Sequence, residues 1–184
     1  MLRKKHEYGQ VQHPVNMPFW RPRRIKRFAW FTPWLARGGQ PSAKALQWLA
    51  AHGVQTIVNL REHDGRRAVE AAGLQYVHIP VKNDRAPTEE QVLEWLRLCE
   101  HHDPSRAVFV HCEAGEGRTS TFCAAVRLAQ GWTARAAIDE QRRFDFKPEG
   151  KHREQAQFLE RFAERVSQGL VVPPRLRTEK REAV

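Results

Sequence analysis

The sequence predicts a single α/β domain in which helices flank a central, mainly parallel sheet. Segments rich in apolar, β-branched and aromatic residues alternate with segments whose apolar residues have helical spacing, and this alternation is typical of the class. The length of 184 residues suits one compact domain. With 41% hydrophobic residues, the chain is globular rather than wholly disordered. No apolar run approaches the roughly 20 residues that a membrane span needs.

The first half of the chain is expected to supply four strands and two helices. Ser42 begins a helix whose apolar stripe ends before Gly53, and a shorter helix near residues 66–72 stops at Gly73. Apolar and aromatic side chains dominate the strand segments between these helices. The four strands are predicted at residues 28–31, 34–37, 54–60 and 74–81.

The second half is expected to supply four helices and one further strand. Residues 88–91 have the pattern of a capping box, and its acidic residues suit the positive end of a helix. The helix that follows is expected to bury Val92, Trp95, Leu96 and Cys99. Residues 107–111 form a short apolar strand. The remaining helices are predicted near residues 118–130, 133–144 and 152–167.

The net charge of +10 is concentrated at the two ends of the chain. Residues 1–27 carry eight Lys or Arg against one acidic residue, and residues 171–184 carry four against two. Residues 28–170 are almost neutral, with 19 basic and 18 acidic residues. We therefore expect a basic N-terminal arm, a folded domain and a polar C-terminal tail over these three ranges. A chain this basic favours nucleic acid, an acidic membrane surface or a phosphorylated substrate as its partner.

The arm at residues 1–27 has two interpretations. Phe19, Trp20 and the neighbouring arginines could contact an acidic surface, as basic and aromatic segments do. The favoured interpretation is a solubilising tail, because runs of charge are usually solvated. The first residues lack the apolar segment of a secretory signal, and three cysteines are too few for a disulfide framework. We therefore expect a reducing, cytoplasmic location.

The most informative stretch runs from a strand through a cysteine and two glycines into a helix. We call residues 112–118, Cys-Glu-Ala-Gly-Glu-Gly-Arg, the signature loop. A loop at a helix N-terminus directs several backbone N–H groups at one point and binds an anion. Gly115 and Gly117 let the backbone close around a phosphate-sized group, and Arg118 offers a planar fork to two phosphate oxygens. The same N–H groups and Arg118 favour the thiolate form of Cys112.

The pattern His-Cys-x-x-Gly-x-x-Arg-Thr resembles the signature of cysteine-dependent protein tyrosine and dual-specificity phosphatases. It is carried here by His111, Cys112, Gly115, Arg118 and Thr119. The alternative, a core cysteine beside an incidental glycine-rich turn, is disfavoured because both motif and context agree. The resemblance covers roughly residues 28–167 and implies a cysteinyl-phosphate intermediate. It also implies that phosphate is bound by Glu113, Ala114, Gly115, Glu116, Gly117 and Arg118.

The resemblance implies a general acid on a loop before the signature loop, and Asp84 matches this position. It lies in residues 82–88, which we call the acid loop, between a strand and a capped helix, with Pro87 stiffening the segment. Asp64 and Asp103 are weaker candidates because neither lies in such a loop. The alternative for Asp84 is a solvated turn residue, since Asp is common in turns.

Three further residues receive roles from the resemblance. Gln155 lies on the apolar face of the last helix and is similar to a late glutamine that positions the hydrolytic water. It is equally well read as the edge of that apolar stripe. Thr119 is expected to stabilise the departing thiolate, and His111 to orient the signature loop rather than to act as a base. No metal-ligand spacing occurs among the histidines and cysteines, and the implied chemistry needs no metal or other cofactor.

Cys99 and Cys123 are most simply core residues. A regulatory disulfide between Cys112 and Cys123 is the less favoured alternative, because buried cysteines are usually inert.

The sequence narrows the substrate only in part. Glu113 and Glu116 place carboxylates where phosphoinositide-directed relatives tend to have lysines. The loop is also similar to that of bacterial phytase-like cysteine phosphatases, which act on inositol polyphosphates. The leading hypothesis is a phosphotyrosine or dual-specificity phosphatase, whose substrate would be a phosphorylated protein or a small phosphate ester. An inositol polyphosphate phosphatase is the alternative. A non-catalytic module that binds phosphate or nucleic acid is a distant third.

Overall fold

The computed structural model describes residues 25–103 and 105–176. The predicted α/β domain with a mainly parallel sheet is confirmed. Within these described residues, five strands lie in the order β1-β2-β5-β3-β4, and only β1 runs antiparallel to its neighbour. The strands are β1 (Ala29–Trp30), β2 (Leu35–Gly38), β3 (Val54–Asn59), β4 (Gln75–His78) and β5 (Ala107–His111).

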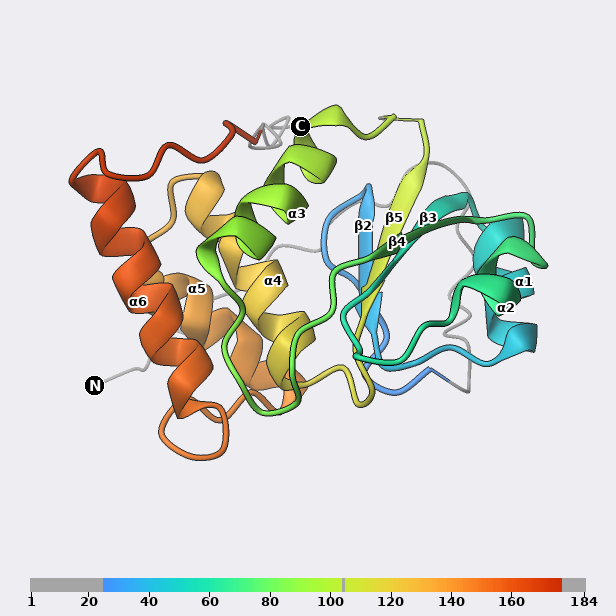
Figure 1. Ribbon diagram of the computed structural model, residues 1–184, viewed down its shortest axis with the longest axis horizontal. Coiled ribbons are helices and arrows are strands. Elements are labelled where there is room, and N and C mark those ends of the chain that lie inside the picture. Colours follow the sequence, from blue (N-terminus) through green and yellow to red (C-terminus); the bar gives the residue numbers. More distant parts are fainter. Residues whose placement is uncertain (1–24, 104, 177–184) are drawn as a thin grey trace, which may run out of the picture.

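The helices cover both faces of the sheet (Figure 1). Helices α1 (Ala43–Ala51) and α2 (Arg66–Glu70) lie on one face. The other face is covered by α3 (Glu89–His101), α4 (Gly117–Ala129), α5 (Ala134–Gln141) and α6 (Arg153–Ser167). No helix within the described ranges is long and apolar enough to cross a membrane.

Strand β5 shows why the sheet sits between two cores. Val108 and Val110 pack into the larger cluster with α3 and α4, whereas Ala107 and Phe109 pack toward α1. Successive side chains of a strand point to opposite faces, so an uninterrupted apolar run buries both. Strand β5 therefore carries the residue that follows it, Cys112, from the middle of the sheet to the carboxyl edge.

Two helix starts follow the side-chain chemistry that the sequence predicts. The Ser42 hydroxyl accepts a hydrogen bond from Ala45 N at the start of α1. At α3, Thr88 and Gln91 form the reciprocal capping box. The second of these starts fixes the end of the acid loop.

Several predicted elements are shorter in the structure than the patterns indicate, and two of these differences have a clear physical reason. The strand expected at residues 74–81 ends at His78, because Pro80 has no N–H for the ladder, although Val81 N still donates to Leu60 O at 3.1 Å. The helix expected at residues 133–144 splits into α5 and a 3-10 turn, Arg142–Phe144, which Asp145 ends with a left-handed φ of 61°.

The ends of the folded body extend beyond the range that charge indicates. Residues 1–24 and 177–184 of the expected arm and tail lie outside the described residues. Ile25, which we expected in the arm, is buried against α1. Val171 and Leu176, expected in the polar tail, are buried in the larger core. Charge counting does not register the few apolar residues that anchor a basic segment to the core, whereas the structure shows three of them.

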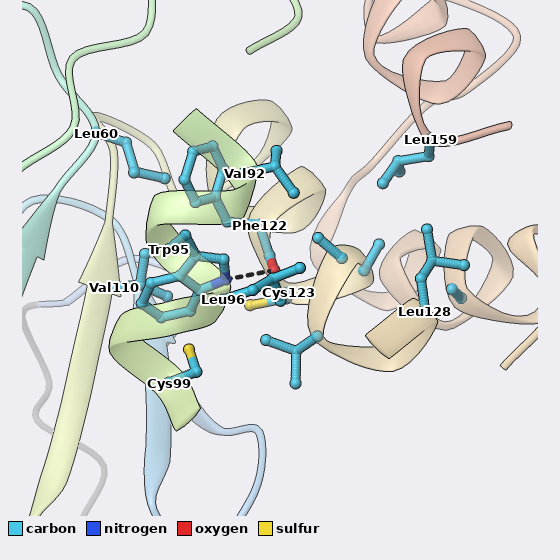
Figure 2. Close-up of a cluster of buried hydrophobic side chains, with 14 of the residues drawn as sticks. Leu60, Val92, Trp95, Leu96, Cys99, Val110, Phe122, Cys123, Leu128 and Leu159 are labelled. Atoms are coloured by element: carbon cyan, nitrogen blue, oxygen red, sulfur yellow. Dashed lines mark hydrogen bonds between the residues drawn. The ribbon is translucent and has the colours of Figure 1, made fainter. Parts of the chain in front are cut away.

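Cys99 and Cys123 are core residues, as predicted. Figure 2 shows both in the cluster around Trp95, whose Nε1 donates to Phe122 O at 2.9 Å. All three cysteines are free. Burial raises the pKa of Cys123 to about 11 and that of Cys99 well above its usual range. Both thiols are therefore protonated at neutral pH, which makes them poor partners for exchange with Cys112.

Candidate active site

The signature loop joins the end of β5 to the start of α4. Cys112 is almost fully buried, and its Sγ accepts a hydrogen bond from Gly115 N at 3.3 Å. Helix α4 has 13 residues, and Glu116 stands at its N-cap. The first N–H groups of a helix have no partner within the helix and carry partial positive charge. The loop therefore curls around the sulfur at the electropositive end of α4.

Gly115 is the position where the loop requires glycine. Its φ is +74°, and a Cβ there would lie 2.6 Å from both Gly38 C and Gly39 N. The loop that follows β2 thus packs backbone against backbone with the signature loop. Gln40 N also donates to Glu113 O at 3.0 Å. The β2–α1 connection therefore supports the signature loop from behind.

Gly115→Ala is expected to destabilise the protein by about 2–4 kcal/mol and to abolish activity, because left-handed strain adds to a backbone clash. Gly131→Ala is the matched control, since Gly131 has a φ of +86° with nothing within 4 Å of its Cβ position. It should cost only about 1 kcal/mol, from strain alone. Urea denaturation of both variants measures the difference. Equal losses would mean that the β2–α1 connection moves aside freely.

A cavity of about 260 Å³ opens over Cys112. The predicted residues Asp84, Cys112, Arg118 and Gln155 all line it, although they come from three separate segments: the acid loop, the signature loop and α6. Its remaining lining residues are Asn83, Glu113, Ala114, Glu116, Gly117, Lys151 and His152. His111, Gly115 and Thr119 stand behind this wall rather than in it.

Arg118 is buried and held over the cavity by the two loops that face it. Its Nη1 donates to Val81 O at 3.0 Å, and its Nη2 donates to Asn83 Oδ1 at 2.9 Å. The guanidinium is thereby oriented before any ligand is present. Such preorientation reduces the entropy lost when a phosphate binds.

Asp84 stands at the tip of the acid loop, on the cavity wall and exposed. Its φ is +58°, a left-handed conformation that Asp and Asn adopt more readily than most residues. Asn83 Nδ2 donates to Asp84 Oδ2 at 2.7 Å while its Oδ1 accepts from Arg118. Asn83, which the sequence did not single out, thus links the Asp84 carboxyl group to the Arg118 guanidinium.

The acid loop is held from the other side by the start of α6. Glu154 accepts from Ala86 N at 3.1 Å and pairs with Arg85 at 3.1 Å. Gln155 Nε2 donates to Arg85 O at 3.0 Å. The predicted loop at residues 82–88 is therefore anchored by residues nearly 70 positions later.

Gln155 also presents an unsatisfied acceptor. Its side chain is 1% exposed and lines the cavity, yet Oε1 has no hydrogen-bond partner within the described chain. Buried polar atoms normally find a partner. An acceptor at this place suits a water molecule or a ligand hydroxyl in the cavity.

The two carboxylates of the signature loop are paired with basic residues. Arg61 Nε lies 2.7 Å from Glu113 Oε2. Arg27 Nη2 lies 2.7 Å from Glu116 Oε1, and Lys151 donates to the other oxygen of Glu116. Burial pushes the pKa of Glu116 upward, but the hydrogen bond from Lys151 and the nearby positive charges outweigh it, so the pKa is lower than usual. The mouth of the cavity therefore carries less negative charge than the loop sequence indicates.

His152 is a second cavity residue that the sequence did not reveal. It is 3% exposed and stacks on Phe146, and its Nδ1 accepts from Lys147 N at 2.9 Å. This bond places the proton of the neutral ring on Nε2, which faces Glu116 at 4.0 Å. Burial and the charge of Lys151 lower the pKa of His152. A single histidine before a helix carries no local signal of such a position.

His111 and Thr119 lie behind the signature loop. His111 Nδ1 lies 3.1 Å from Cys112 O, an arrangement that suits an orienting role. Burial lowers the pKa of His111 to about 4, so the ring is neutral at physiological pH. The Thr119 hydroxyl donates to Gly38 O at 3.4 Å. Its predicted contact with the thiolate of Cys112 stays a prediction.

The buried neutral state of His111 predicts a pH dependence of stability. Between pH 6.5 and 4 the unfolded chain binds a proton at this histidine that the folded protein does not, so the free energy of unfolding falls as the pH falls. The loss between pH 7 and pH 5 should be about 2 kcal/mol, measured by urea denaturation. His111→Gln should remove this part of the loss, whereas His101→Gln, at an exposed site, should keep it. An unchanged difference in His111→Gln would contradict the assignment.

Comparison with known proteins places the chain in a family. Residues 32–160 match the family model described as a DSP-PTPase phosphatase fused to NAD+ kinase. The chain is 31% identical over 131 residues to the dual specificity protein phosphatase TpbA of Pseudomonas aeruginosa strain UCBPP-PA14. The match covers 70% of this chain and spans 59% of that relative's length.

Solved structures agree with this match. A crystal structure of a mutant form of Tk-PTP superposes with a TM-score of 0.66 at 27% identity, covering 77% of this chain and 97% of that one. A crystal structure of a P. aeruginosa TpbA variant in complex with pTyr superposes with a TM-score of 0.61 at 25% identity, covering 75% and 90%.

Proposed function

Because this chain belongs to the dual-specificity and tyrosine phosphatase family of cysteine-dependent phosphatases, we propose that it hydrolyses phosphotyrosine, alone or together with phosphoserine and phosphothreonine, through a cysteinyl-phosphate intermediate. The observation that carries the proposal is one cavity lined by Cys112, Arg118 and Asp84 together. A nucleophile, a phosphate-binding fork and a proton donor are the groups that this reaction needs. Their convergence also argues against a module that binds phosphate without hydrolysing it.

In the proposed first step the Cys112 thiolate attacks phosphorus. An S–P bond forms as the bond from phosphorus to the ester oxygen breaks, and Asp84 gives its proton to that departing oxygen. Arg118 and the N–H groups of the signature loop bind the non-bridging oxygens, whose charge is spread in the transition state.

In the second step water attacks the cysteinyl-phosphate. Asp84, now ionised, accepts a proton from the water as the new P–O bond forms and the S–P bond breaks. The free acceptor of Gln155 supports its role in holding this water, because Oε1 lies buried on the cavity wall. The Cys112 thiolate leaves and is stabilised by Gly115 N.

The phosphotyrosine proposal is supported by the paired state of the loop carboxylates and by the pTyr complex of TpbA, a protein to which this chain is similar. Inositol polyphosphates form the second candidate substrate class. Arg61 and Lys151 pair with loop carboxylates, and a polyanion could take these cations over. Turnover of a phosphotyrosine peptide, a phosphoserine peptide, a phosphoinositide and an inositol polyphosphate at equal concentration separates the two classes.

An aryl phosphate tests the reaction class itself. Activity should survive EDTA, since every proposed group is a side chain or backbone atom of this chain, and orthovanadate should inhibit it. Loss of activity on chelation that added Mg²⁺ restores would contradict the cysteine mechanism.

The arm, the location and the domain arrangement are further proposals. We propose that the basic residues before Ile25 are not needed for catalysis, and that the protein works in a reducing compartment such as the cytoplasm. Free cysteines with one required thiol support this location. A deletion of residues 1–24 should leave turnover of an aryl phosphate unchanged. If the full chain binds nucleic acid or anionic vesicles and the deletion variant does not, residues 1–24 are responsible for that binding.

A further inference from the structure

Arg37 is a buried arginine that the phosphatase chemistry described above does not use. It lies in β2 beside Val110 of β5 and is fully buried. Its Nη1 donates to Ser120 Oγ at 3.1 Å and to Gln141 Oε1 at 2.9 Å. Its Nε has no hydrogen-bond partner within the described residues. A guanidinium stays protonated in proteins, so Arg37 places a full positive charge inside the fold.

The partners of this charge are neutral. Within residues 25–103 and 105–176, no carboxylate forms an ion pair with Arg37; instead the guanidinium lies 3.8 Å from the centroid of the Phe144 ring. Burying a charge without an opposite charge is costly. A positive charge buried in this way attracts an anion strongly, because the surroundings screen it little.

One contact of Arg37 reaches the signature loop directly. Its Nη2 donates to the carbonyl oxygen of Gly115. The N–H of Glu116 belongs to the same peptide unit, and in a planar trans peptide it points away from that carbonyl. Glu116 lines the cavity on the far side. Arg37 therefore fixes the rotation of the peptide that presents the Glu116 N–H to a bound phosphate.

The nearby titratable groups identify the anion that fits this charge. Burial lowers the pKa of Arg37, the ionised forms of Cys123 and Cys112 oppose that change, and the positive charges of Arg143 and Arg27 add to it. Cys123 is protonated at neutral pH, since burial raises its pKa to about 11. Gly115 links Arg37 to the other thiol: its carbonyl oxygen accepts from Arg37, and its N–H donates to Cys112 Sγ at 3.3 Å. An anion at Cys112, either its thiolate or a phosphate bound to the loop, is therefore one peptide away from the charge of Arg37.

We propose that Arg37 is a positioning residue of the active site: it holds the Gly115–Glu116 peptide in its phosphate-binding orientation and supplies a buried positive charge to the Cys112 thiolate and the bound oxyanion. Arg37 touches neither substrate nor sulfur and acts through Gly115 and through its charge. The proposal rests on the proposed function. It adds Arg37, which contacts the signature loop from β2, to Arg118, which belongs to that loop.

The test compares Arg37→Met, which removes the charge, with Arg37→Lys, which keeps it. Two readouts apply to the full chain: the pH midpoint for alkylation of Cys112 by iodoacetamide, located by mass spectrometry, and the inhibition constant of orthovanadate. In Arg37→Met the alkylation midpoint should rise by about one pH unit or more, and vanadate should bind about tenfold more weakly. In Arg37→Lys the midpoint should stay near that of the wild type, while vanadate binding should still weaken, because a lysine cannot hold all three acceptors at once.

Arg127→Met is the matched control. Arg127 also lies over aromatic rings and pairs with Glu140, but it does not line the cavity or contact the signature loop. Its loss should lower thermal stability without moving either readout. If folded Arg37→Met has the alkylation midpoint and the vanadate affinity of Arg127→Met, Arg37 is only structural and the proposal is overturned.

Two further outcomes keep the test decisive. If Arg37→Met does not fold, Arg37→Lys decides, and an unchanged vanadate affinity in that variant overturns the proposal. A wild-type chain that neither turns over an aryl phosphate nor binds vanadate would overturn the proposed function instead. The two failures are therefore distinguishable.

Discussion

Replacing the sulfur at the base of the cavity, in Cys112→Ser, is expected to lower turnover of an aryl phosphate by at least about 10⁴-fold, as loss of a covalent nucleophile does in other hydrolases. A serine hydroxyl is not ionised at neutral pH, and His111 is not placed to act as its base, since its Nδ1 faces Cys112 O. Binding should survive, because Arg118 and the backbone N–H groups are untouched. Isothermal titration with a phosphotyrosine peptide should therefore detect a stable complex without hydrolysis.

Cys99→Ala is the control for this experiment. Cys99 is as buried as Cys112 but lies on α3 in the core, away from the cavity. The variant should lose some stability and keep full turnover. Residual activity of Cys112→Ser above the background of the buffer, with the same vanadate sensitivity as the wild type, would rule out Cys112 as the nucleophile.

Asp84→Asn is expected to slow hydrolysis of a phosphate ester with a poor leaving group by about 10²- to 10⁴-fold. An ester with a good leaving group, such as a nitrophenyl phosphate, should be affected far less, because its oxygen departs without a proton. Asparagine is the right replacement here. It tolerates the left-handed φ of +58° at this position, and its side-chain oxygen can still accept from Asn83. The variant therefore removes the proton and little else.

The ratio of rates for the two leaving groups, measured for wild type and variant, decides the role of Asp84. Asp103→Asn is a suitable control, since Asp103 pairs with Ser105 after α3 and does not line the cavity. An equal loss on both esters would assign Asp84 to binding or to folding of the loop rather than to proton transfer.

The local part of the site could be predicted from the sequence, and the long-range part could not. The signature loop follows a strand directly and leads directly into a helix. Because all of these residues are consecutive, the positions of the glycines and of Arg118 in the sequence predict the local structure of the loop. Asp84 was predicted as well, because the resemblance implies a general acid on a loop at this point, and the boundaries of that loop, a strand and a capped helix, are local patterns. All four of the main predicted residues line one cavity.

The residues that the sequence missed act across long separations. Asn83 meets Arg118 at a separation of 35 residues, and Arg37 meets Gly115 at 78. The residues next to Arg37 in the sequence do not show whether its side chain is buried in the fold or exposed at the end of a strand. Gln155 was predictable only in part. Its place on the apolar stripe indicated a buried amide, but only the fold shows that its Oε1 is left without a hydrogen-bond partner within the described residues. The same limitation explains Ile25, whose basic neighbours concealed an apolar anchor.

The acid loop is tied at two points to the first turn of α6, through Glu154 and Gln155. The acid loop, which carries the proposed proton donor Asp84, therefore does not take its position independently. Its position depends on how α6 packs against the rest of the domain. We therefore expect a substitution of Glu154, which does not line the cavity, to change how firmly the acid loop is held.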